Sequence, residues 1–241
     1  MVPVSFAPLV FAGEEWRLVE GRALHWPREA ALVVADLHLE KASWYAARGQ
    51  MLPPYDSRAT LERLAQAIGA SAARRVFCLG DNFHDAEGPS RMEPQAARML
   101  AALTRAVDFV WITGNHDAAL GAGMGGGIGG VLAPEITVGG IVLRHHAQSG
   151  ERAHELSGHF HPRLALSPHG RRIARPCAVA SERRMILPAF GALTGGMKAD
   201  DPAILAALQP ARAIRALVAV RDRLLQFSLW QENSAKAAAG A

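Results

Sequence analysis

Residues 157 to 162 read SGHFHP and place two histidines, His159 and His161, two positions apart. In an extended chain, side chains at positions i and i+2 point to the same side. We therefore expect both imidazoles to lie on one side of this segment. The segment alone is compatible with either a polar surface or a metal site, so the rest of the chain has to decide.

Four apolar, strand-like runs end in clusters of Asp, His and Asn. The clusters are Asp36-Leu37-His38 after ALVVA, GDNFHD (80–85) after VFCL, TGNHD (113–117) after FVWI, and His145-His146 after GIVLR. Ligands of α/β proteins bind at the carboxyl ends of strands. The four clusters therefore predict one convergent site.

Each of these residues, taken alone, also has an ordinary explanation. An Asp after a strand, such as Asp36 or Asp81, often caps the next helix, and an isolated His is more often a hydrogen-bonded polar residue than a ligand. Capping does not require D-x-H, G-D, G-N-H-D, a strand-end His and G-H-x-H in that order. The joint pattern therefore favours a functional site.

The residue types indicate metal chemistry. Carboxylate, imidazole and amide oxygen suit borderline-hard divalent ions such as Mn, Fe and Zn, whereas a soft site would use thiolate. Asp36 and His38 can share one ion, and a single carboxylate between two ligand sets, that of Asp81, can bridge two. Two metals about 3.5 to 4 Å apart can clamp a phosphoryl group and generate hydroxide at neutral pH.

All five blocks, in order over residues 36 to 161, resemble the calcineurin-like metallophosphoesterase superfamily. The resemblance implies an α/β fold, a four-layer α/β/β/α sandwich in which two mixed β-sheets are flanked by helices. It also implies a dinuclear centre. One metal would be held by Asp36, His38 and His161, and the other by Asn115, His145 and His159, with Asp81 bridging them.

The same resemblance implies catalytic roles for two residues outside the metal ligands. His116 would contact the scissile phosphate, as proton donor to the leaving oxygen or as a stabiliser of the transition state. Asp117 would orient His116 by hydrogen bonding, as residues just outside the metal ligands commonly do.

Three positions near these blocks are less constrained by the resemblance. In the commoner pattern the fourth-block histidine precedes Gly, whereas here the chain reads His145-His146-Ala147. We prefer His145 over His146, because His145 directly ends the apolar run. Asp85 is expected to support the ligands from outside, and His84 is expected either to touch substrate or to face solvent.

A narrower resemblance rests on MLPPYDSRATLERL (51–64), GDNFHD, GNHD, GHFHP and LPAFGALTGG (187–196). Over residues 15 to 230, roughly, these segments resemble the ligase-associated DNA damage response endonuclease family (PdeM type). This implies phosphodiester cleavage by a metal-activated hydroxide, with manganese as the expected ion and Fe, Zn, Co or Ni as alternatives. It implies DNA as substrate, single-stranded or with single-stranded regions. An ATP-dependent DNA ligase, a helicase and an exonuclease-like protein would be partners.

Two other functions stay open at this point. The same dimetal site could serve a small-molecule phosphodiesterase or phosphatase. A non-catalytic interaction module on this fold would have lost metal ligands, but here every ligand position is filled and His116 is present.

The charge distribution bears on the substrate. From Gly140 to Phe190 there are eight arginines, three glutamates and neither Lys nor Asp, so the net charge of this segment is +5. The whole chain has a net charge of +4, so the rest of the chain has a net charge of −1. A basic segment suggests a polyanionic partner, and a solubilising arginine face is the alternative. In a nuclease these arginines would hold flanking backbone phosphates.

The elements expected to position these residues alternate at first and then become strands. Strands are predicted at 31–35, 76–79, 109–112, 140–145, 154–158, 172–180 and 184–190, helices at 57–70 and 92–107, and hairpins at 16–26 and 216–230. This order predicts one α/β domain over 1–231, followed by a disordered tail at 232–241. The G-x-G-x-x-G match at 121–126 leads into more glycine and is interpreted as a loop.

The remaining composition bears on location. Cys78 and Cys177 form no disulfide framework, the first residues lack a basic signal-peptide region, and no apolar stretch is suited to span a membrane. We therefore expect a cytoplasmic protein in a reducing compartment, with no membrane partner.

Overall fold

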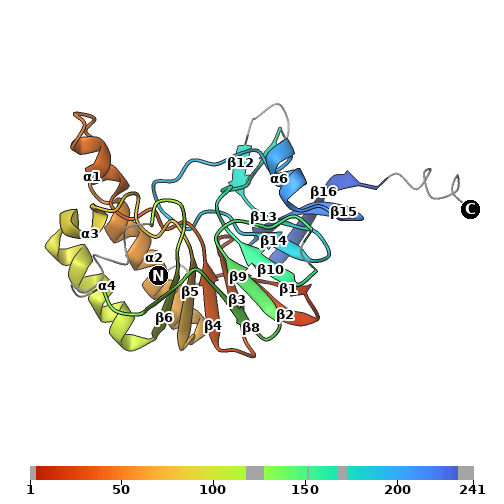
Figure 1. Cartoon of the computed structure of the whole chain (residues 1–241), viewed down its shortest axis with the longest axis horizontal. Coiled ribbons are helices and arrows are strands. Elements are labelled where there is room, and N and C mark those ends of the chain that lie inside the picture. The colour runs from red at the N-terminus through yellow and green to blue at the C-terminus, as the bar shows by residue number, and fades with distance from the viewer. Residues whose placement is uncertain (1–3, 118–127, 151, 168–172, 233–241) are drawn as a thin grey trace, which may run out of the picture.

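The computed structural model describes residues 4–117, 128–150, 152–167 and 173–232. Two seven-stranded sheets face each other, with helices on their outer sides (Figure 1). The predicted four-layer α/β/β/α sandwich is confirmed. The G-x-G-x-x-G match and residues 233–241 of the predicted tail lie outside the described residues, and the single domain over 1–231 stays a prediction.

The first sheet has the strand order β1-β2-β3-β4-β5-β6-β7. Its strands are β1 (Phe6–Phe11), β2 (Glu14–Val19), β3 (Ala23–Trp26), β4 (Ala31–Val34), β5 (Arg75–Leu79), β6 (Asp108–Ile112) and β7 (Val131–Ala133). Strands β1 to β4 pair antiparallel, whereas β4, β5, β6 and β7 pair parallel. The carboxyl ends of β4, β5 and β6 therefore meet at one edge, which carries the first three clusters.

The second sheet has the order β16-β15-β13-β14-β10-β9-β8. Its strands are β8 (Glu135–Val138), β9 (Ile141–Arg144), β10 (His154–Ser157), β13 (Ala178–Ala180), β14 (Arg184–Ile186), β15 (Ala213–Val220) and β16 (Arg223–Gln231). Strand β10 pairs parallel with β9 and with β14. His145 therefore follows β9 and the G-H-x-H block follows β10, at neighbouring strand ends.

Helices and a small hairpin complete the layers. The helices are α1 (Lys41–Ala46), α2 (Asp56–Ser71), α3 (Gly88–Arg91), α4 (Pro94–Ala106) and α6 (Pro202–Ala207), and the hairpin is β11 (Arg163–Leu166) with β12 (Ile173–Pro176). None of the described helices has the length and apolar character needed to cross a membrane.

Three apolar clusters hold the layers together. Leu24, Val33 and Phe77 of the first sheet pack against Leu143 and Leu156 of the second, between the sheets. Side chains of α2 and α4 cover the outer face of the first sheet, and α6 packs on the outer face of the second. Burial on both faces explains why the central strands read as unbroken apolar runs.

The predicted elements differ from the structure mainly where the chain changes sheet. The strand predicted at 172–180 is two strands, because β12 and β13 belong to different sheets. The strand predicted at 184–190 ends at Ile186, and the chain then leaves the sheet toward the site. Strands β1, β7, β8 and β11 and helices α1, α3 and α6 were not anticipated.

Candidate metal centre

The backbone at the predicted ligands is bent into an uncommon conformation. The left-handed values of φ are 53° at Asp36, 43° at His38, 47° at Asp81, 74° at His159 and 49° at His161. Non-glycine residues rarely adopt this region, and each instance costs about 1–3 kcal/mol. The extended geometry assumed for SGHFHP is therefore wrong, since the segment bends at both histidines and sends them to different clusters.

Two motif glycines permit backbones to approach the ligands closely. A Cβ on Gly158 would lie 2.7 Å from Asp36 Oδ2, and one on Gly80, where φ is +76°, would lie 2.3 Å from His145 Nδ1. Any side chain at either position would push a predicted ligand away. The glycines of the G-D and G-H-x-H blocks are thus explained by space.

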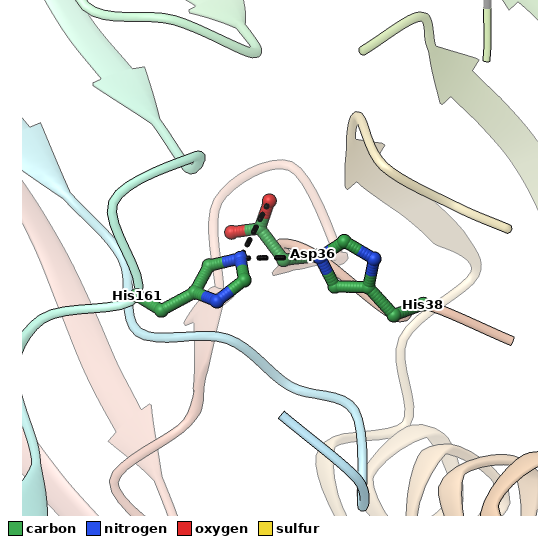
Figure 2. A group of neighbouring side chains, drawn as sticks. All are labelled: Asp36, His38 and His161. Carbon is green, nitrogen blue, oxygen red and sulfur yellow. Dashed lines mark hydrogen bonds and ion pairs between the residues drawn. The ribbon is translucent and has the colours of Figure 1, made fainter. Parts of the chain in front are cut away.

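One cluster joins Asp36, His38 and His161 (Figure 2). His161 Nε2 lies 3.5 Å from Asp36 Oδ1 and 3.2 Å from His38 Nε2. Asp36 is fully buried, and its carboxylate accepts hydrogen bonds from the backbone N–H of His159 at 3.1 and 3.0 Å. The two imidazole nitrogens therefore converge on a fixed carboxylate.

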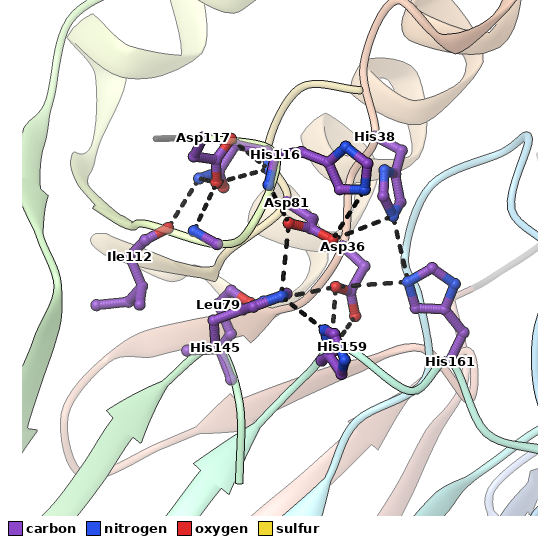
Figure 3. Close-up of polar contacts among 12 residues, drawn as sticks. Asp36, His38, Leu79, Asp81, Ile112, His116, Asp117, His145, His159 and His161 are labelled. Atoms are coloured by element: carbon purple, nitrogen blue, oxygen red, sulfur yellow. Dashed lines mark hydrogen bonds and ion pairs between the residues drawn. The ribbon is translucent and has the colours of Figure 1, made fainter. Parts of the chain in front are cut away.

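A second cluster joins Asp81, His145 and His159 (Figure 3). His145 Nε2 lies 3.5 Å from Asp81 Oδ1 and 3.1 Å from His159 Nδ1. His145 Nδ1 lies 2.9 Å from the carbonyl oxygen of Leu79. Because a carbonyl only accepts, Nδ1 carries the proton and Nε2 presents its lone pair to the cluster. The structure brings His145 here, whereas His146 is exposed.

The Asp81 carboxylate lies between these two clusters. Its Oδ1 faces His145, and its Oδ2 lies 3.8 Å from His38 Nε2 and 3.9 Å from His116 Nε2. Oδ1 also accepts from the backbone N–H of His116 at 3.1 Å. One carboxylate thus offers an oxygen to each side, which is the arrangement a bridging ligand requires.

Two of the predicted ligands, His38 and His159, have lowered pKa values. Burial, followed by the charges of His161 and Lys41, lowers the pKa of His38 to about 2. Burial, followed by the charges of His145 and His146, also lowers the pKa of His159. Metals bind neutral imidazole, so these side chains need lose no proton to become ligands near neutral pH.

The donor set fits divalent metal ions. Ligands about 2.0–2.2 Å from one ion lie roughly 3 to 3.5 Å from one another, and the contacts within the two clusters, 3.1 to 3.5 Å, match this spacing. The donors are carboxylate oxygens and imidazole nitrogens, while Cys78 and Cys177 are buried elsewhere in the core. The chemistry favours borderline-hard ions.

The residues of the GNHD block do not all make the contacts that the sequence suggests. Asn115 is exposed in the turn that precedes His116, and His116 has a 44% exposed side chain. Asp117 makes no hydrogen bond to the His116 imidazole among the described residues. Its carboxylate instead accepts from Gly114 N at 2.9 Å and from Asn82 N and Nδ2 at 3.1 and 2.8 Å. Asp117 therefore ties together the loops after β5 and β6.

Two aromatic residues of α1, Trp44 and Tyr45, pack beside His84, and this contact was not predicted from the sequence. The His84 ring stacks on His116 at 5.3 Å and on Tyr45 at 6.3 Å between centroids, and Trp44 meets it edge-on at 4.8 Å. Asp85 pairs with Arg91. The adjacent Trp44-Tyr45 pair, soon after D-x-H, was the available signal.

Several arginines of the basic segment serve the fold instead of a partner. Arg144 is buried and pairs with Glu155 and Glu135. Arg184 is fully buried and donates to the carbonyl oxygen of Gln148 at 2.9 Å. The expectation that all arginines of this segment face phosphates is therefore wrong. Residues 171 and 172 lie outside the described residues.

A family model and one similar crystal structure agree with this geometry. A family model described as "Calcineurin-like phosphoesterase" matches residues 31–165. The crystal structure of Pseudomonas putida nuclease MPE is similar with 28% identity and a TM-score of 0.71, over 91% of this chain and 100% of that one. YfcE, a phosphoesterase from E. coli, aligns with 14% identity and a TM-score of 0.41, over 83% and 99% of the two chains. No curated protein sequence matches the chain.

The adjacent histidines provide a matched pair of variants. His145→Ala removes a side chain of the second cluster, so bound metal falls from about two ions per chain to about one. His146→Ala removes an exposed imidazole and leaves both ions. Elemental analysis after dialysis checks this, and equal metal content in the two variants would contradict the assignment.

Gly158→Ala tests the close approach at Asp36. The added methyl collides with Oδ2, so the variant loses metal and activity and its melting temperature falls. Gly69→Ala in α2 is the control, because a Cβ there meets nothing within 4 Å and its φ is ordinary for a residue with a side chain. Full metal occupancy in Gly158→Ala would refute the steric account.

Proposed function

The chain belongs to the calcineurin-like phosphoesterase family and is a metal-dependent phosphoesterase, and we propose that it is a DNA endonuclease that uses manganese. The observation that carries the proposal is the Asp81 carboxylate, which offers one oxygen to each of two histidine clusters beside the exposed His116. The similar solved structure is described as a nuclease, and this supports a nucleic-acid substrate.

The proposed function assigns the predicted ligands to two metal ions. One ion would be held by Asp36, His38 and His161, and a second by His145, His159 and Asn115, with Asp81 shared. Bound divalent ions supply Lewis acidity toward phosphoryl oxygens and lower the pKa of coordinated water. The buried carboxylates and the hydrogen bond from His145 to Leu79 keep the ligands oriented without further rearrangement.

His116 acts on the leaving group. Its side chain is 44% exposed and its Nε2 lies 3.9 Å from Asp81 Oδ2. In this position it donates a proton to the departing sugar oxygen, which is a poor leaving group as an alkoxide. Its ring is held by stacking on His84 and by its own backbone bond to Asp81, and Asp117 fixes the loop from which it projects.

The setting of the reaction is part of the proposal. The likeness of LPAFGALTGG and the other quoted segments to the ligase-associated endonucleases supports repair of DNA with single-stranded regions. The same likeness supports an ATP-dependent ligase, a helicase and an exonuclease-like protein as partners. Both cysteines are free and buried, which suits a cytoplasmic, reducing location.

Circular single-stranded DNA tests the proposed activity. With Mn²⁺, the protein is expected to linearise and then degrade the circle, because an endonuclease needs no free end. Asp81→Ala is expected to be inactive, and activity retained in that variant would point to a contaminant. Hydrolysis of a small aryl phosphodiester without any cleavage of DNA would favour a small-molecule phosphodiesterase instead.

Leaving-group dependence tests the role of His116. His116→Ala is expected to slow DNA cleavage by about 10²–10⁴-fold. Hydrolysis of bis(4-nitrophenyl) phosphate should change far less, because nitrophenolate departs without a proton. His146→Ala is the control. An equal loss on both substrates would instead assign His116 to transition-state stabilisation.

A further inference from the structure

Two arginines hold the LPAFGALTGG segment against the site. Arg22, in the turn between β2 and β3, donates from Nη1 to the carbonyl oxygen of Ala189 at 2.6 Å. Arg63 of α2 donates from Nη1 to the carbonyl oxygen of Phe190 at 2.6 Å, and its guanidinium lies 5.6 Å from the Phe190 ring centroid. Each guanidinium is therefore fixed in orientation by a main-chain oxygen.

Arg163 brings a third guanidinium to the same place. It begins β11, two residues after His161, and its Nε is buried with no hydrogen-bond partner among the described residues. Arg22, Arg163 and His161 line one pocket of about 10 Å³ together with Pro188 and Thr194, so a phosphate would lie over its mouth and not inside it. This pocket therefore adjoins a predicted metal ligand on one side and arginines on the other.

The arginine group has no compensating anion of its own. Burial, followed by the charges of Arg63 and Arg163, lowers the pKa of Arg22 to about 10. The charge of the exposed Glu20 carboxylate acts to raise the pKa of Arg63. No described carboxylate, however, forms an ion pair with Arg22, Arg63 or Arg163. Half-buried like charges are unfavourable in isolation, and a bound anion relieves both their repulsion and their unmet hydrogen bonds.

The basic surface continues away from the centre. Arg22 and Pro176 also line a neighbouring pocket of about 400 Å³, together with Arg175, Val218 and one acidic residue, Glu20. The sequence of features is thus the metal-binding cluster at His161, then the first pocket, then this second pocket. A chain of phosphates leaving the centre would follow this direction.

We propose that Arg22 and Arg163, with the positive charge of Arg63 nearby, form a subsite for a non-scissile backbone phosphate of the DNA strand whose scissile bond lies at the metal centre. This inference rests on the proposed function. The planar guanidinium fork matches two phosphate oxygens, and phosphate contacts fix the register of a strand without reading its bases. The LPAFGALTGG segment then orients the subsite, because its carbonyl oxygens accept hydrogen bonds from Arg22 and Arg63.

Arg163→Gln tests the subsite, because this side chain anchors none of the loop carbonyls. Values of kcat/KM are measured over a range of salt for a single-stranded oligonucleotide and for bis(4-nitrophenyl) phosphate, which has no flanking phosphate. Arg105→Gln, at an exposed position in the last turn of α4, removes the same charge and is the matched control.

The expected result is a loss of about tenfold or more in kcat/KM for the oligonucleotide and a salt slope smaller by about 0.7, the value for one contact to a single strand. The aryl ester should be unaffected. Oligonucleotide kinetics equal to those of Arg105→Gln, or equal losses on both substrates, overturn the subsite alone. Wild-type protein that hydrolyses the aryl ester but never DNA overturns the proposed function and the subsite with it.

Discussion

One carboxylate has to serve two groups of histidines from the end of a buried strand. Asp81 follows β5, which lies between β4 and β6, and it is 4% exposed. Its two oxygens face His145 and His38, which come from different sheets. The two opposed sheets end at the same side, and this arrangement brings residues from both of them to one carboxylate.

That constraint has local costs which the rest of the fold offsets. Five predicted site residues occupy left-handed backbone, and the buried carboxylate of Asp36 would be unfavourable without the N–H of His159. The apolar layer between the sheets and the clusters beneath α2, α4 and α6 supply the compensating burial. Asp117 and the close contacts at Gly80 and Gly158 restrain the backbone around Asp81 and Asp36.

The central strands and the convergence of the clusters could be predicted, because buried parallel strands are apolar runs that end in polar residues. The bends at His159 and His161 could not, since local sequence favours an extended path and tertiary contacts override it. The role of Asp117 was also beyond prediction, because its partners are main-chain N–H groups distant in sequence. The role of each arginine could not be predicted either, because it depends on the residues around it in the fold. Arg144 forms an ion pair with Glu155, whereas Arg163 lines a pocket beside His161.

The central claim is that Asp81 is shared between two metal ions. Anomalous diffraction from crystals of the protein grown with Mn²⁺ tests it most directly. Two peaks about 3.5–4 Å apart are predicted, one beside Oδ1 with His145 and His159 and the other beside Oδ2 with Asp36, His38 and His161. A single peak, or two peaks of which only one contacts Asp81, would contradict the account.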